Sequence, residues 1–150
     1  MINLYRLRFI VAVIFVLAVM TSCGSGSSFQ REEGGTTAMQ LRINDVPVAV
    51  KWEDNDSVKA LQGLSPLTVK MSMYGGFEQV GGLGRSLPRH DTRITTKAGD
   101  IVLYSGNQIV IFYGSNTWAY TKLGRITDKT QDELSDLMGN GNVTLKLSTN

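Results

Sequence analysis

The chain is poor in the side chains that metal binding and nucleophilic catalysis require. Its 150 residues include one cysteine, Cys23, and one histidine, His90. A single cysteine excludes a disulfide framework within the chain. Without a second histidine or a cysteine partner, a zinc site or a Ser-His-Asp triad has almost no residues from which to be assembled. We therefore expect no metal and no cofactor.

The chain also has little excess of either positive or negative charge. Fifteen Lys and Arg residues stand against thirteen Asp and Glu residues, and two of the basic residues, Arg6 and Arg8, precede an apolar segment near the N-terminus. If that segment is removed, thirteen basic residues face thirteen acidic ones. A neutral chain gives no reason to expect nucleic acid as a partner.

Residues 17–24 place Cys23 directly after the apolar segment, in the sequence LAVMTSCG. The apolar residues 9–20 number about a dozen, whereas a helix that spans a membrane needs roughly 20. The pattern resembles the lipobox of bacterial lipoproteins. It implies a signal peptide over residues 1–22 and a Cys23 that carries diacylglyceryl and a further acyl chain such as palmitate. An uncleaved or conventionally secreted chain with a stray thiol is the alternative.

Residues 24–37 are rich in glycine, serine and charge, which makes them too polar to repay the entropy of ordering. We interpret residues 23–37 as a lipidated flexible tether. Residues 38–150 then form one domain of ordinary size, without an internal repeat. We expect this domain to be monomeric and to be held at the cell envelope through the lipid on Cys23.

Alternation of apolar and polar residues predicts a mainly β domain. Residues 39–52 form a hairpin around Asn44 and Asp45, and further strands are predicted at residues 67–73, 100–104, 108–113, 118–126 and 143–147. The strands at residues 100–104 and 108–113 are apolar on both faces, so we expect them to be central and covered on both sides.

Two short helices fit the remaining sequence. Residues 54–56 offer caps for a helix over residues 57–64, and residues 130–133 match a capping box ahead of Leu134, Leu137 and Met138. Seven or eight strands and two helices in this length predict a small closed β-barrel that is plugged or capped by the helices, because closure removes exposed strand edges.

Three segments carry a family resemblance: GDIVLY at residues 99–104, IFYG at 111–114 and WAYTKLGRI at 118–126. Together with the opening hairpin, they resemble the small bacterial cyclophilin-like family over about residues 39–147. The resemblance implies the eight-stranded barrel with two helices of the cyclophilins, which are peptidyl-prolyl isomerases. It does not by itself imply their activity.

In cyclophilins, a Phe-His-Arg run supplies the arginine that binds the prolyl nitrogen, and a Gln-Gly-Gly run supplies a glutamine. Neither run occurs here. The glycine-rich residues 74–88 contain Phe77, Gln79 and Arg85 in a different arrangement, and we expect the glycines to form turns or to allow close backbone approach.

The candidate ligand-binding residues are one set from this segment and one set of aromatic residues. They are Phe77, Gln79, Arg85, Tyr113, Trp118 and Tyr120. A core position remains the alternative for Tyr113 and Trp118. Arg85, Arg89, His90 and Arg93 form a basic cluster, which either clamps a carboxylate or carbonyl oxygen or is a solvated loop balanced by Asp91. No residue stands out as catalytic.

These observations favour a lipid-anchored, cyclophilin-like binding domain of the bacterial envelope that holds a peptide or a small molecule without catalysis. Two alternatives remain. One is a weak peptidyl-prolyl isomerase acting on exported proteins. The other is an accessory component of an envelope complex that has no small-molecule site.

Overall fold

The computed structural model describes residues 38–150. The predicted signal peptide, Cys23 and the tether lie outside the described residues. Within the described part, eleven strands and two helices follow one another along the chain. They are β1 (Met39–Ile43), β2 (Val46–Val48), β3 (Val50–Trp52), α1 (Asp56–Gln62), β4 (Leu67–Lys70), β5 (Ser72–Tyr74), β6 (Glu78–Gly82), β7 (Thr92–Thr95), β8 (Asp100–Tyr104), β9 (Gln108–Phe112), β10 (Thr117–Ile126), α2 (Gln131–Met138) and β11 (Thr144–Thr149).

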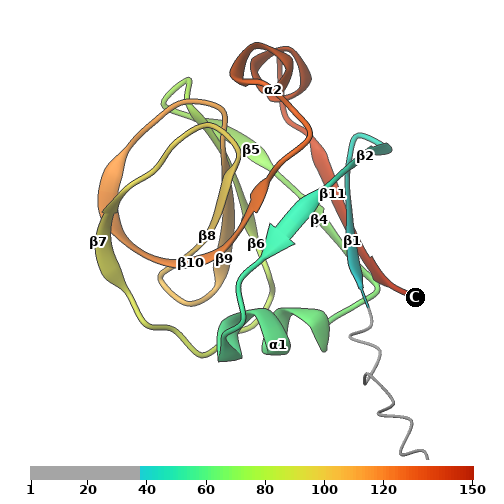
Figure 1. Cartoon of the computed structure of the whole chain (residues 1–150), viewed down its shortest axis with the longest axis vertical. Helices are drawn as coiled ribbons and strands as arrows, with labels where there is room; N and C mark the ends of the chain where they lie inside the picture. Colours follow the sequence, from blue (N-terminus) through green and yellow to red (C-terminus); the bar gives the residue numbers. More distant parts are fainter. Residues whose placement is uncertain (1–37) are drawn as a thin grey trace, which may run out of the picture. The chain divides into compact units, whose positions relative to one another are not determined.

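The strands form two antiparallel sheets (Figure 1). The smaller sheet has the order β2-β1-β11-β4. The predicted hairpin forms strands β1 and β2 of this sheet. The turn between them places Asn44 and Asp45 at positive φ, 48° and 65°. Asparagine and aspartate tolerate this conformation, which is the one that a two-residue hairpin turn requires.

The larger sheet has the order β3-β10-β8-β9-β6-β5, and β7 pairs with the first residues of β10. Strand β10 is ten residues long, so it reaches beyond β8. Its Thr117–Tyr120 portion pairs with β7, and the portion from Thr121 to Arg125 pairs with β8. The residues of β10 that extend past β8 therefore form a two-stranded ribbon with β7.

Two chain segments pass from one sheet to the other. Only Ala49 separates β2 from β3, and only Met71 separates β4 from β5. At Ala49 the backbone N–H donates to the Asp128 side chain at 3.0 Å, and the Met71 N–H donates to the Val143 carbonyl at 2.8 Å. The mainly β fold with two helices is confirmed. The strand pairing forms two separate sheets, because it is interrupted at Ala49 and Met71. The closed eight-stranded barrel is therefore not confirmed.

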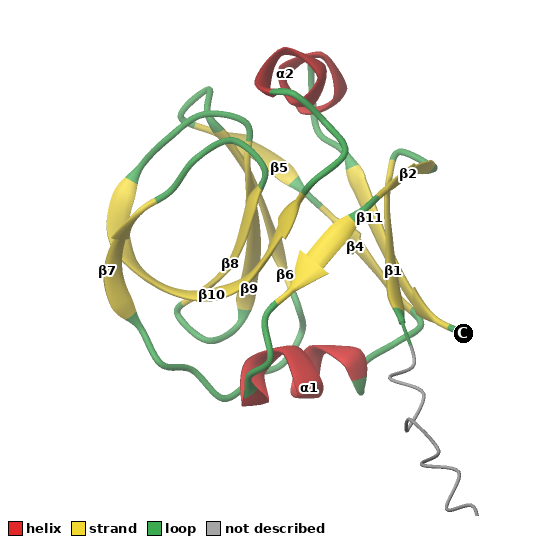
Figure 2. Cartoon of the chain, viewed as in Figure 1, coloured by secondary structure: helices red, strands yellow, loops and turns green. Residues whose placement is uncertain are grey.

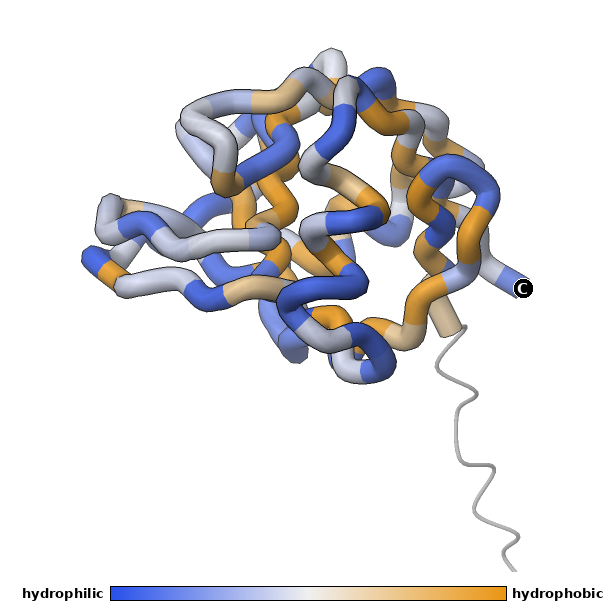
Figure 3. Tube along the Cα trace, turned by 90° about the horizontal axis from the view of Figure 1, so that it is seen from above, coloured by the Kyte–Doolittle hydropathy of each residue, from blue (hydrophilic) through white to orange (hydrophobic). Residues whose placement is uncertain are grey.

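The main hydrophobic core combines side chains from both sheets and both helices. Strands β8 and β9 contribute to it alternately, with Ile101, Leu103, Ile109 and Ile111 fully buried. Their intervening residues, Val102 and Val110 among them, form a second cluster with Phe112 and Tyr120 on the opposite face of the sheet. These strands are buried on both faces, as predicted. Figure 3 colours the trace by hydropathy, with apolar residues in orange.

The two helices lie at opposite ends of the described domain (Figure 2). The Asn55 side chain accepts a hydrogen bond from the Val58 N–H at 2.9 Å and so caps α1, which buries Val58 and Leu61. The capping box predicted for α2 is present between Thr130 and Glu133. Both helices therefore begin near the predicted residues, because capping is decided by side chains close in sequence.

Two strands, β6 and β7, were not assigned from the sequence. Strand β6 lies inside the glycine-rich segment, where glycine lowers the strand propensity. We expected these glycines to form turns or to allow close backbone approach, and both roles are confirmed at particular positions. Gly75, Gly76 and Gly84 have positive φ, and a Cβ on Gly81 would collide with the side chains of Val69 and Met71. Gly81 therefore lets β6 approach the smaller sheet.

We predict that Gly81→Ala lowers the free energy of unfolding by about 1–3 kcal/mol, because an added methyl group would overpack the core against Val69 and Met71. Gly82→Ala is the matched control, since a Cβ there meets no atom within 4 Å. Chemical denaturation of both variants measures the difference. Equal stability of the two variants would contradict the close approach of β6 to β4.

Candidate ligand-binding site

A cavity of about 490 Å³ lies on the face of the larger sheet that points away from the main core. Pairing in β6 defines this face. Glu78 and Val80 pair with Phe112 and Val110 and share their side of the sheet, whereas Gln79 and Gly81 face inward. The lining residues come from five strands and from the residue before β10. They are Ser72, Met73, Tyr74, Glu78, Val80, Tyr104, Gln108, Val110, Asn116, Trp118 and Tyr120.

Tyr120 is the buried aromatic residue of the cavity wall. Its ring packs edge-on against Phe112 and Tyr104, with centroid distances of 5.7 Å and 6.0 Å. Its hydroxyl oxygen accepts a hydrogen bond from the Asn116 side-chain amide at 2.9 Å. Burial, together with the charge of Glu78, raises the pKa of this hydroxyl. The ring is therefore held in one position by aromatic packing and a hydrogen bond.

The ribbon of β7 and β10 positions Asn116 and Trp118. Thr96 N–H donates to the Asn116 carbonyl at 2.8 Å, and Asn116 N–H donates to Thr96 Oγ1 at 3.0 Å. In the ribbon itself, Trp118 pairs with Ile94. These bonds fix the backbone at the edge of the cavity and leave the Trp118 side chain 53% exposed.

The rim of the cavity gathers most of the exposed large apolar side chains. Such residues in the described part are Val46, Met73, Tyr74, Tyr104 and Trp118, and all except Val46 line the cavity. Single exposed apolar residues are common on protein surfaces, but a cluster of them around a hollow is typical of a binding site.

Glu78 supplies the carboxyl group of the cavity. The residue is only 6% exposed, and its Oε2 atom has no hydrogen-bond partner among the described residues. Burial raises the pKa of this carboxyl group to about 7. No lysine, arginine or histidine lines the cavity. A desolvated carboxyl group without a partner is costly in a folded protein and is often found at functional sites.

Of the six predicted ligand-binding residues, two line the cavity and four lie elsewhere in the domain. Trp118 and Tyr120 line the cavity, whereas Phe77 does not line it and packs against the second apolar cluster. Tyr113 lies in the main core, and its hydroxyl has no hydrogen-bond partner in the described residues. Arg85 is exposed between β6 and β7 and does not line the cavity.

Gln79 is fully buried on the core side of β6. Its side-chain amide donates to the carbonyl oxygens of Met138 and Gly141, each at 2.7 Å. These are the last residue of α2 and a residue of the following loop. Gln79 therefore ties the end of α2 to the larger sheet, and it makes no contact with the cavity on the other face.

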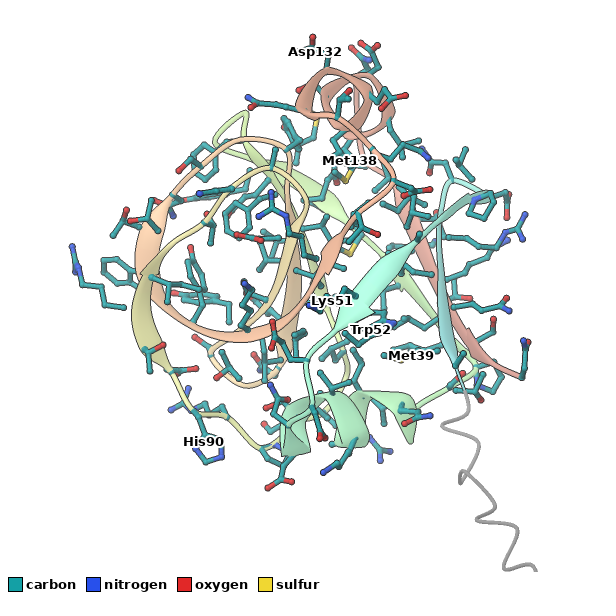
Figure 4. All side chains as sticks on the ribbon, in the orientation of Figure 1. Met39, Lys51, Trp52, His90, Asp132 and Met138 are labelled. Atoms are coloured by element: carbon teal, nitrogen blue, oxygen red, sulfur yellow. The ribbon has the colours of Figure 1, made fainter. Side chains whose placement is uncertain are left out.

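The predicted basic cluster lies in the loop before β7 and in β7 itself. Arg89 is 3.6 Å from the carboxylate of Asp91, and the other oxygen of Asp91 accepts a hydrogen bond from the Thr121 hydroxyl at 2.7 Å. His90 is exposed and points away from the domain (Figure 4). None of the four basic residues lines the cavity.

Sequence reasoning missed Glu78, Tyr74, Tyr104 and Asn116. The signal for Glu78 was present in the alternation of residues 78–81, in which Gln79 and Gly81 share one face and Glu78 and Val80 the other. It could be used only after residues 78–82 were recognised as a strand.

Among residues 38–150, no group of three or more His, Cys, Asp or Glu side chains could hold a metal ion. The same residues include no helix long and apolar enough to cross a membrane.

We predict that Glu78→Gln stabilises the protein at pH 8 and has little effect at pH 4. The folded state keeps the Glu78 proton up to about pH 7, whereas the unfolded chain loses it near the ordinary value of 4.5. The stability of the natural chain should therefore fall as pH rises between these values. The gain at pH 8 is at most about 3.5 kcal/mol, since a tenfold change in an ionisation constant corresponds to about 1.4 kcal/mol.

Denaturation midpoints across this pH range measure the effect. Glu53→Gln is the control, because Glu53 is half-exposed, lies outside the cavity and pairs with Lys122 at 3.8 Å. This control should retain the pH dependence of the natural chain. Parallel profiles for the natural chain and Glu78→Gln would show that the Glu78 carboxyl group is well solvated.

Comparison with protein families matches residues 41–148 to the model of the cyclophilin-like family. Comparison with curated proteins gives no match. The matched residues include both helices, every residue that lines the cavity and all strand residues except Met39, Gln40 and Thr149. The chain therefore belongs to the cyclophilin-like family.

Proposed function

We propose that this domain is a binding module that holds a small molecule or a peptide side chain in the cavity of the larger sheet, without catalysing a reaction on it. The observation that carries the proposal is the coincidence of an aromatic rim with an unpartnered, buried carboxyl group. A cavity of about 490 Å³ is within the usual size of small-molecule sites.

The composition of the cavity supports binding over prolyl isomerisation. Twisting an X–Pro bond must overcome a barrier of ~18–20 kcal/mol, and cyclophilins assist it with an arginine beside the proline pocket. Here the cavity contains no arginine, and its one charged group is Glu78. Arg85 and Arg89, the nearest substitutes suggested by the sequence, lie outside it.

We further infer that the two sheets act as one eight-stranded barrel. Single residues, Ala49 and Met71, separate the paired segments β2–β3 and β4–β5, so that each pair continues one strand direction into the other sheet. The missing Cβ of Gly81 brings β6 against Val69 of β4. Without β7, which pairs only with the first residues of β10, eight strands counted in this way surround the main core.

The cellular location of the domain is also a proposal. The lipobox-like residues around Cys23 favour a lipid anchor at the bacterial envelope, with residues 24–37 as a tether and the cavity domain as a monomer beside the membrane.

We predict that a screen of small fragments and short peptides against the full chain yields ligands that shift the indole N–H signal of Trp118 in NMR spectra. Trp118 lies at the cavity, whereas the indole of Trp52 donates to the Met39 carbonyl at 2.9 Å and provides an internal control. Trp118→Phe and Trp52→Phe assign the two signals. Ligands that shift only Trp52, or no ligand at all, would refute binding in the cavity.

The same protein should leave the isomerisation rate of a standard Xaa-Pro substrate close to the uncatalysed value. Each ~1.4 kcal/mol of lost transition-state stabilisation costs tenfold in rate, so a site without the arginine is a poor catalyst. A kcat/KM near that of authentic cyclophilins, abolished by Arg85→Ala or Arg89→Ala, would replace binding with isomerisation as the function.

We predict that Cys23→Ser abolishes incorporation of a labelled fatty acid when the full chain is expressed in bacteria, because the thiol is the proposed acceptor of the lipid. Ser22→Ala is the control, since a small residue is retained before Cys23. Electrophoresis of the labelled protein measures both. Lipid on the Cys23→Ser chain would show that the anchor assignment is wrong.

A further inference from the structure

We infer that the ligand of this cavity is an amine that is protonated at neutral pH, with its N–H groups directed at Glu78 and an apolar stem lying among the aromatic side chains. The inference rests on the proposed function, and it adds the chemical class of the ligand.

The charge of the cavity is the first argument. Glu78 is its one ionisable carboxyl group, and no basic side chain lines it. The six ion pairs among the described residues all leave Glu78 out. Burial is the cause that acts on the pKa of Glu78, with no neighbouring cation opposing it. A cation in the cavity would therefore meet a carboxyl group that has no cationic partner within the described residues.

The second argument is the unfilled acceptor. Glu78 lines the cavity, and its buried Oε2 atom accepts no hydrogen bond from the described residues. Two polar residues of the wall, Asn116 and Tyr120, are already joined to each other by a hydrogen bond. An ammonium N–H would give Glu78 a charge-assisted hydrogen bond, which is stronger than one from a neutral donor.

The third argument is the aromatic wall. Tyr74, Tyr104, Trp118 and Tyr120 line the cavity with Glu78, and Tyr74 pairs directly with Glu78 across β5 and β6. The faces of tyrosine and tryptophan rings attract organic cations. Val80 and Val110 offer apolar surface for a stem. An anionic ligand would meet like charge here, and a fully apolar ligand would leave the buried carboxyl group without a donor.

Protonation of Glu78 should weaken binding. The titratable groups that share the cavity with Glu78 are the hydroxyls of Tyr74, Tyr104 and Tyr120, and Tyr113 lies behind it in the core. Burial raises the pKa of Tyr113 and Tyr120, so these hydroxyls stay neutral near pH 7. Glu78 is then the group that titrates in this range. Affinity for an amine should therefore rise from pH 5.5 to pH 8, whereas affinity for a neutral analogue should not.

Three matched probes test the inference against the full chain by calorimetry and by the Trp118 signal. 2-Phenylethylamine carries charge and N–H donors, its N,N,N-trimethyl derivative carries charge alone, and 2-phenylethanol is neutral. At pH 8 we expect the amine to bind at least tenfold more tightly than the alcohol, with the trimethyl derivative in between. Equal affinity of the amine and the alcohol would overturn the inference. Equal affinity of the amine and the trimethyl derivative would overturn the hydrogen bond to Glu78.

Glu78→Gln should remove the preference for the amine over the alcohol, and Glu53→Gln should retain it. Retention of the preference in Glu78→Gln overturns the inference. If this variant fails to fold, the natural chain supplies the decisive measurement, because its affinity for the amine should rise at least fivefold between pH 5.5 and pH 8. A constant affinity over this range overturns the inference.

Failure of this inference and failure of the proposed function give different results. A neutral fragment that shifts Trp118 while the amine does not refutes the amine and leaves binding in the cavity intact. No shift from any probe or fragment refutes both. Nα-acetyl-lysine N-methylamide identifies the source of the amine: tighter binding than 2-phenylethylamine indicates a lysine side chain of a peptide, and weaker binding indicates a small free amine.

Discussion

Burial of the β8–β9 hairpin on both faces is the constraint on which the rest of the structure depends. Ile101, Leu103, Ile109 and Ile111 fill the main core, and Val102 and Val110 must be covered on the opposite face. A sheet whose strands are apolar on both sides needs cover on both sides. The smaller sheet and the helices contribute to the cover of the first face, and the aromatic residues around Tyr120 contribute to that of the second. The cavity lies where this second cover is incomplete.

Strand β6 links the core to the cavity because its neighbouring residues face opposite ways. Gln79 points inward and donates to two carbonyl oxygens at the end of α2, while Glu78 points outward into the cavity. Gly81 then allows the strand to lie close to Val69 and Met71. One strand therefore anchors a helix, joins the two sheets and presents the carboxyl group of the site.

Membership of the cyclophilin-like family fixes the architecture more firmly than it fixes the chemistry. The matched residues include the whole cavity, yet the charged group in that cavity is a carboxyl group. A shared fold carries different sites according to the side chains on its strands. In this chain the cavity combines an aromatic rim with the buried carboxyl group of Glu78, and no basic side chain lines it.

The sequence by itself determined the features that depend on near neighbours. The hairpin at Asn44 and Asp45, the capping box at Thr130 and Glu133, and the apolar strands β8 and β9 follow from short-range rules of turn geometry, capping and alternation. Tertiary structure decided the rest. Glycine obscured β6, which is stabilised by pairing with β5 and β9, and the cavity joins Tyr74, Glu78, Tyr104 and Trp118 from four strands. No local pattern shows that Glu78 lacks a partner, because burial and hydrogen bonding are set by residues distant in the sequence.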